Sequence, residues 1–245
     1  MVSSSISKDD FANQSHEVLY SSRLSFEEKN LLDEITHQFN AVQEHNQGRF
    51  FNKLVSNFLS QDNVKDMGHY GVAMQAFLKE NPEHFKQGNH IESMRRTGAF
   101  DALMRAELSY PSVEADAERV KLGGNLLLQP EFIDGGNDME RASLLHRYIQ
   151  ESHSLGQETA NICLEKTTAF LASDTCIGDL SDHALPMIAG DVHRFWPTEE
   201  GAEALYDTIK GNSRLVKAVF NDNGNTITAK AAANSVNAPA LKPGQ

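Results

Sequence analysis

The stretch SFEEKNLLDEITHQFNAVQEH, residues 25–45, predicts an amphipathic helix and with it the fold class. Ser25 and Glu28 form the S-x-x-E pattern of a capping box, in which each side chain bonds the other's backbone N–H at a helix start. Apolar residues then recur with the spacing of one helix face. They are Leu31, Leu32, Ile35, Phe39 and Val42. We therefore expect a helix that begins after Ser25 and packs on a core.

Helical spacing continues along most of the chain. Residues 49–62 place Phe50, Leu54, Val55, Phe58 and Leu59 on one face. Further helices are predicted over residues 67–78, 91–108, 113–121, 139–156, 157–173 and 198–211. The segment NLLLQPEFI, residues 125–133, is the best strand candidate because it follows two glycines and is rich in apolar residues. The prediction is a mainly α chain with a single helical domain of about seven to nine helices, residues 25–220, and at most one short strand pair near 125–133.

Charge and hydropathy exclude two classes of partner. The 245 residues carry a formal net charge of −12, so the chain lacks the basic surface that nucleic-acid binding requires. The same charge disfavours docking on anionic lipid. No run of eighteen apolar residues occurs, and we expect no membrane span.

The two ends of the sequence differ in composition from its middle. Eight serines fall within the first 25 residues, which predicts a disordered leader over residues 1–24. This leader resembles the unfolded, Ser-rich leaders of bacterial type III effectors, which implies export by a non-Sec route into a host cell. An ordinary frayed terminus of a cytoplasmic protein is the alternative. Residues 221–245 are predicted to be a disordered tail.

Histidines gather on the predicted helix 139–156. His146, Gln150 and His153 lie on one stripe, with the two histidines about 10 Å apart along the axis. An apolar segment followed by such a helix is similar to the zincin metallopeptidases, whose helix carries HExxH. The pattern here is HRYIQ, with Arg147 in place of the acid and Gln150 in place of the second histidine. Since arginine cannot act as the general base and glutamine is a poor zinc ligand, the resemblance implies a degenerate site without zinc catalysis.

The stretch GDLSDHALPMIAGDVHRFW, residues 178–196, adds a second group of polar residues. In extended backbone, Asp191 and His193 would point to one side of the chain and could form a metal pair or an oriented base. Asp182 and His183 could join them only through a bent loop. The alternative is a connection between helices in which Asp182 and Asp191 act as N-caps, with Trp196 as a core anchor.

Chain order suggests a second resemblance. Residues 37–62 have some similarity to the opening helices of haem-oxygenase-like and TenA-like proteins, some of which bind two irons through Glu and His residues. The comparable order here is Glu83, His90, Glu151, His183, Asp191 and His193. The closing cluster departs from that family, because Pro186 and Gly190 interrupt it. The resemblance implies iron.

Two functions from different classes follow. The first is a metal-assisted hydrolase or oxidase that acts on a small-molecule or protein substrate and uses zinc or iron. Its predicted metal ligands are His146, His153, His183 and Asp191, with Glu151 and His193 as catalytic residues. The second is a non-catalytic helical interaction protein, in one form a secreted effector that binds a host protein.

Cysteine chemistry offers one further site. Cys176 could act as a nucleophile with His183 and Asp191, if the fold brings them together. Cys163 lies in a helical run and is predicted to be a small core residue.

Overall fold

The computed structural model describes residues 23–42, 49–82, 90–108, 111–129, 138–173, 176, 184–195 and 207. Eight helices account for nearly all of these residues, and none of them lies in a strand. The helices are α2 (Phe26–Asn40), α3 (Phe50–Leu59), α4 (Val64–Glu80), α6 (His90–Arg105), α7 (Val113–Leu127), α9 (Asp138–Ser154), α10 (Gln157–Ala172) and α12 (Leu185–Phe195). The mainly α prediction is confirmed.

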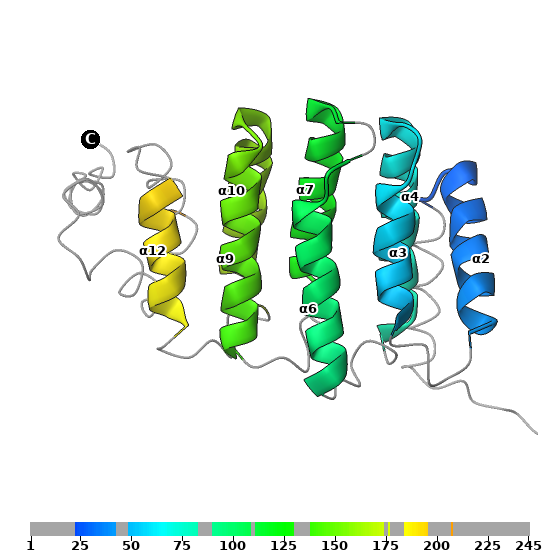
Figure 1. The fold of residues 1–245 in the computed structure, drawn as a ribbon, viewed down its shortest axis with the longest axis horizontal. Coiled ribbons are helices and arrows are strands. Elements are labelled where there is room, and N and C mark those ends of the chain that lie inside the picture. The colour runs from blue at the N-terminus through cyan, green and yellow to red at the C-terminus, as the bar shows by residue number, and fades with distance from the viewer. Residues whose placement is uncertain are drawn as a thin grey trace, which may run out of the picture.

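The helices form a row of hairpins two layers deep (Figure 1). In the first layer α3, α6, α9 and α12 pack each on the next, and in the second layer α2, α4, α7 and α10 do the same. First-layer helices begin at residues 50, 90, 138 and 185, a spacing of roughly 40–48 residues that is typical of two-helix repeats. The sequence shows no internal repeat, so the repetition lies in the backbone.

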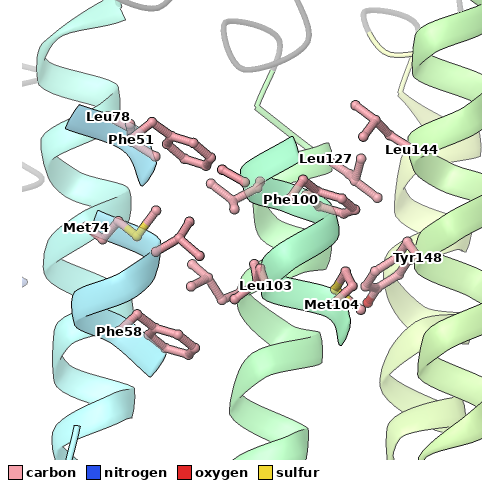
Figure 2. Packing of buried hydrophobic residues seen from close by; sticks show 14 of the residues in the cluster. Phe51, Phe58, Met74, Leu78, Phe100, Leu103, Met104, Leu127, Leu144 and Tyr148 are labelled. Carbon is pink, nitrogen blue, oxygen red and sulfur yellow. The ribbon is translucent and has the colours of Figure 1, made fainter. Parts of the chain in front are cut away.

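A continuous hydrophobic core fills the space between the layers (Figure 2). At its α2 end the rings of Phe39, Phe50 and Phe77 meet edge to face, with centroids 5.2–5.7 Å apart. Leu32 and Ile35 of α2 are buried with Phe39, as their spacing predicts, and Leu31 and Val42 pack against the core from its rim. The capping box at Ser25 and Glu28 is also present.

The strand predicted near residues 125–133 is wrong where the structure describes it. Helix α7 runs through Gly123 and Gly124 to Leu127 and ends in a turn at Leu128. The two glycines do not interrupt α7, and they lie where side chains of neighbouring helices contact it. A Cβ on Gly123 would lie 2.7 Å from Sδ of Met104, and one on Gly124 would lie 2.5 Å from the Tyr148 hydroxyl. The lack of side chains therefore lets α6, α9 and α10 approach α7.

The loop predicted around Asp191 is also wrong, because residues 185–195 form helix α12. Asp191 and His193 are therefore not in extended backbone, and positions two apart on a helix do not share a face. Asp191 lies inside α12 and is not its N-cap. Pro186 is in the first turn, where a helix tolerates proline.

Several predictions fall outside the described residues. They concern the leader up to residue 22, the helix 198–211, the tail 221–245, and the residues Glu83, Asp182, His183 and Trp196. Among the helices that the structure describes, none is long and apolar enough to cross a membrane.

Candidate functional site between α9 and α12

Helix α9 carries three of the six predicted site residues, His146, Glu151 and His153, and they contact two neighbouring helices. Leu145, Tyr148 and Ile149 are fully buried in the core. Glu151 lies toward α6, where it contacts Arg105, and His146 lies toward α12, where it contacts Asp191. The site residues on this one helix therefore belong to different interfaces.

The closest pair is His146 and Asp191. Nδ1 of His146 lies 2.8 Å from Oδ1 and 2.7 Å from Oδ2 of Asp191. An ionised carboxylate only accepts hydrogen bonds, so Nδ1 of His146 donates to Asp191 and Nε2 does not take part in this contact. The Asp191 side chain is 6% exposed and that of His146 is 34% exposed, so a buried carboxylate orients a partly exposed imidazole.

Burial controls the ionisation of Asp191. Desolvation raises the pKa of this carboxyl above its ordinary value, although the hydrogen bond from His146 and the charges of His146 and Arg194 oppose the rise. The net direction is upward, so the ionised form is less favourable inside the protein than in water. His146 and Arg194 therefore offset only part of the cost of burying the Asp191 carboxylate.

His153 has a different neighbour on α12. Its ring centroid lies 4.8 Å from that of Phe195, and the guanidinium of Arg194 lies 5.0 Å from the same phenyl ring on α12. Burial lowers the pKa of His153, which favours the neutral imidazole. His146 and His153 therefore contact α12 at two separate points, one polar and one aromatic.

Glu151 belongs to a charge network between α6 and α9. It lies 2.8 Å from Nε of Arg105 and 3.6 Å from Nη1 of Arg147, and Arg147 in turn lies 3.3 Å from Asp101. Helical positions five apart are about 140° apart around the axis, so Glu151 and His146 point to different sides of α9. The structure does not bring Glu151 to the His146–Asp191 pair.

The predicted metal site is only partly described. Two of its ligands, His146 and Asp191, contact each other directly. In the described ranges no three His, Cys, Asp or Glu side chains are grouped so that they could hold a metal ion. His183 and the side chains of His193 and His90 lie outside the described residues, so the metal and the roles of these histidines stay predictions.

Both cysteines are buried thiols. Burial raises the pKa of Cys163 to about 12, and its Sγ lies 3.8 Å from the Thr167 hydroxyl. Burial also raises the pKa of Cys176, whose thiol donates to the carbonyl of Leu127. Protonated, buried thiols are weak nucleophiles, so these surroundings do not favour the Cys176 hypothesis. The prediction of Cys163 as a core residue agrees with its burial.

The sequence around α12 has the periodicity of a helix. Ala184, Ile188, Asp191 and Phe195 recur at positions i, i+4, i+7 and i+11, the spacing of one helix face. Asp191 is the only polar member of this face, and it meets the histidine stripe of α9. This periodicity indicates a helix over these residues, but the partner of Asp191 is known only from the structure.

Comparison with known proteins gives no relative: no family model, no curated protein and no solved structure matches the chain. The functional argument therefore depends on the chain's own residues.

Proposed function

We propose that this chain is a non-catalytic helical interaction protein that binds another protein through a face of its helical row. The observation that carries the proposal is the two-layer stack of hairpins, since such rows present broad, continuous faces on which partners dock. The contacts of the predicted site residues agree with this proposal. His146 and Glu151 join α9 to its neighbours on either side.

Charge indicates which face to test first. Second-layer helices α2, α4, α7 and α10 contain eleven acidic and six basic residues, a net charge of −5. First-layer helices α3, α6, α9 and α12 contain six acidic and seven basic residues, a net charge of +1. A partner with a basic surface would be steered to the second layer. In the effector form of the proposal, the partner is a host protein.

The test compares charge-matched variants of the two faces. Glu114→Gln with Glu158→Gln removes two negative charges from exposed positions of the second layer, and Asn52→Lys with Ser143→Lys adds two positive charges to exposed positions of the first. Partners isolated with the wild-type chain are purified, and their Kd is measured at two salt concentrations. We expect the second-layer pair to weaken binding several-fold and the first-layer pair to leave it unchanged. Equal binding by all three proteins, or no direct binding by any, contradicts the proposal.

A second candidate, the metal-assisted hydrolase or oxidase, is favoured by one observation. The buried Asp191 carboxylate holds Nδ1 of His146 and leaves Nε2 on the partly exposed side, as in carboxylate–histidine–metal arrangements. His146 through Nε2, with His153 and His183, would hold zinc or iron, Asp191 would orient His146 instead of binding the ion, and His193 would transfer protons.

Metal analysis tests this candidate. The purified chain is incubated with Zn(II) or Fe(II), passed over a desalting column and analysed for bound metal. The candidate predicts about one equivalent, which His146→Ala abolishes while the exposed-site control His37→Ala retains it. Less than about a tenth of an equivalent in the wild type rejects it.

A further inference from the structure

We propose that α12, the last helix that the structure describes, detaches from α9 as a unit while the other described helices stay folded. This inference is independent of the proposed function. It begins with position: α12 is the last described helix of the row (Figure 1), and among the described helices α9 is the one on which it packs extensively. Interior helices such as α7 pack on α4, α6, α9 and α10. Among the described residues, a helix that packs extensively on one neighbour loses fewer contacts on opening than a helix that packs on four.

The interface itself is polar at its centre. Asp191 is buried there and contacts His146, and the cost of removing its carboxylate from water offsets much of the stability that this contact supplies. The other charged or titratable groups that act on Asp191 are Arg194 on α12 itself and Cys163 on α10. The described apolar anchors are the buried Ile188 in α12 and Ala184 just before it, with Met187 and Phe195 partly buried against the core.

The interior junction of α7, α9 and α10 is built differently. The Tyr148 ring of α9 is fully buried against α7, and its hydroxyl donates to the carbonyl of Val120 at 3.1 Å. Separating these helices would expose a large aromatic ring to water, which costs more than exposing an imidazole. The α9–α12 contact is therefore the place where the row can open first.

Undocking changes the surface of the protein. It uncovers the α9 stripe that carries His146 and His153, both of which can be hydrated by water. It also reduces the burial of Cys163, whose pKa is influenced by Asp191 and which therefore lies near the α9–α12 contact. When α12 is docked, it forms this part of the protein surface. When α12 is undocked, the α9 stripe with His146 and His153 forms it.

Hydrogen exchange of the full-length chain, read on peptides of each helix, tests the proposal. We expect α12 amides to exchange on the order of a hundredfold faster than those of α9 and α10, through an opening that depends little on denaturant. Asp191→Ala should increase α12 exchange on the order of tenfold because it removes the bond to His146, and Asp191→Asn should restore much of the protection.

A pair of glycine variants keeps the test decisive if Asp191→Ala fails to fold. Gly190 in α12 and Gly98 in α6 are both exposed, and a Cβ on either would meet nothing within 4 Å. Gly190→Ala should slow α12 exchange by about fivefold because alanine favours the helix. Gly98→Ala should leave α12 exchange unchanged. Exchange of α12 at the same rate and with the same denaturant dependence as α9 and α10, or equal slowing of all helices by Gly190→Ala, overturns the proposal.

Discussion

The hydroxyl of Tyr148 lies 2.5 Å from the position that a Cβ on Gly124 would occupy. The same Cβ would lie 2.7 Å from Cβ of Lys166, so side chains of α9 and α10 close on α7 at one glycine. Figure 2 shows Tyr148 beside Met104, which is the side chain that a Cβ on neighbouring Gly123 would meet. The glycine pair sets how closely three helices of the row approach.

Gly124→Ala should therefore destabilise the protein although alanine is the better helix former. The backbone of α10 would have to shift, because Cβ of Lys166 cannot rotate away, and overpacking of this kind costs about 1–3 kcal/mol. Gly98→Ala is the matched control, since its Cβ has open space, and it should stabilise by up to about 1 kcal/mol. Urea unfolding of both variants measures the difference, and equal effects would show that the close approach is unimportant.

Glu28 should make stability fall at acidic pH. Burial by itself raises the pKa of Glu28, but hydrogen bonds from the Ser25 N–H and from the side chains of His69 and Ser25 outweigh it, and the net pKa is lowered. A lowered folded-state pKa stabilises the fold above the unfolded value, about 4.3, and this contribution is lost as the pH falls through the folded value.

Glu28→Gln should consequently be less stable than the wild type at neutral pH and converge with it in acid. Thermal unfolding between about pH 3 and pH 7 provides the measurement. Glu114→Gln, at an exposed position in the first turn of α7, controls for the loss of one carboxylate near a helix start. If the difference in thermal stability between Glu28→Gln and the wild type does not narrow in acid, the proposed role of the Glu28 carboxylate is contradicted.

Asp191 should have the opposite effect to Glu28, because it should weaken the docking of α12 as the pH rises. Its folded-state pKa is raised, so its contribution to docking is fully present below the unfolded value, about 3.9, and is lost as the pH rises through the folded value. Asp191→Asn still accepts from Nδ1 of His146 but carries no charge, so it should remove this loss. Exchange of α12 amides, corrected for the intrinsic effect of pH, should depend less on pH in the variant. A variant with the wild-type pH profile would refute the prediction.

Glu151 should couple energetically to Arg105 and not to His146. A double-mutant cycle with Arg105→Ala and Glu151→Ala should give a coupling of about 0.3–1 kcal/mol, because Arg105 is half exposed and the pair is partly screened. The cycle between Glu151→Ala and His146→Ala should give a value near zero. Strong coupling in the second cycle would instead support the predicted metal site, in which His146 is a ligand and Glu151 a catalytic residue.

Local patterns predicted what depends on neighbours along the chain. Helix α2 starts after its Ser25 cap, and Phe50, Leu54, Val55 and Phe58 of α3 are buried as their spacing requires. The sequence-based predictions were wrong where a residue type is compatible with both a helix and a break. Gly123 and Gly124 signal a break in isolation, but here they are contact points inside α7. Pro186 and Gly190 suggested a loop, although α12 has proline in its first turn and glycine on its exposed side.

The candidate site was also only partly predictable from the sequence. The sequence identified His146, His153 and Asp191 as residues of interest, because histidines and acids gather in this part of the chain. It could not pair them, since His146 and Asp191 are 45 positions apart and no local rule connects two helices of a row.

The sequence by itself determined the helical class, the start of α2 at its cap and the apolar faces of α2 and α3, since these follow from bonds and periodicities within a few residues of chain. Only the tertiary structure decided the order of the helices in two layers, the close approach at Gly124 and the partners of His146 and Glu151. The physical reason is that a charged or polar side chain on one helix is compatible with several neighbours. Its partner is fixed only when the core has packed and placed a specific helix beside it.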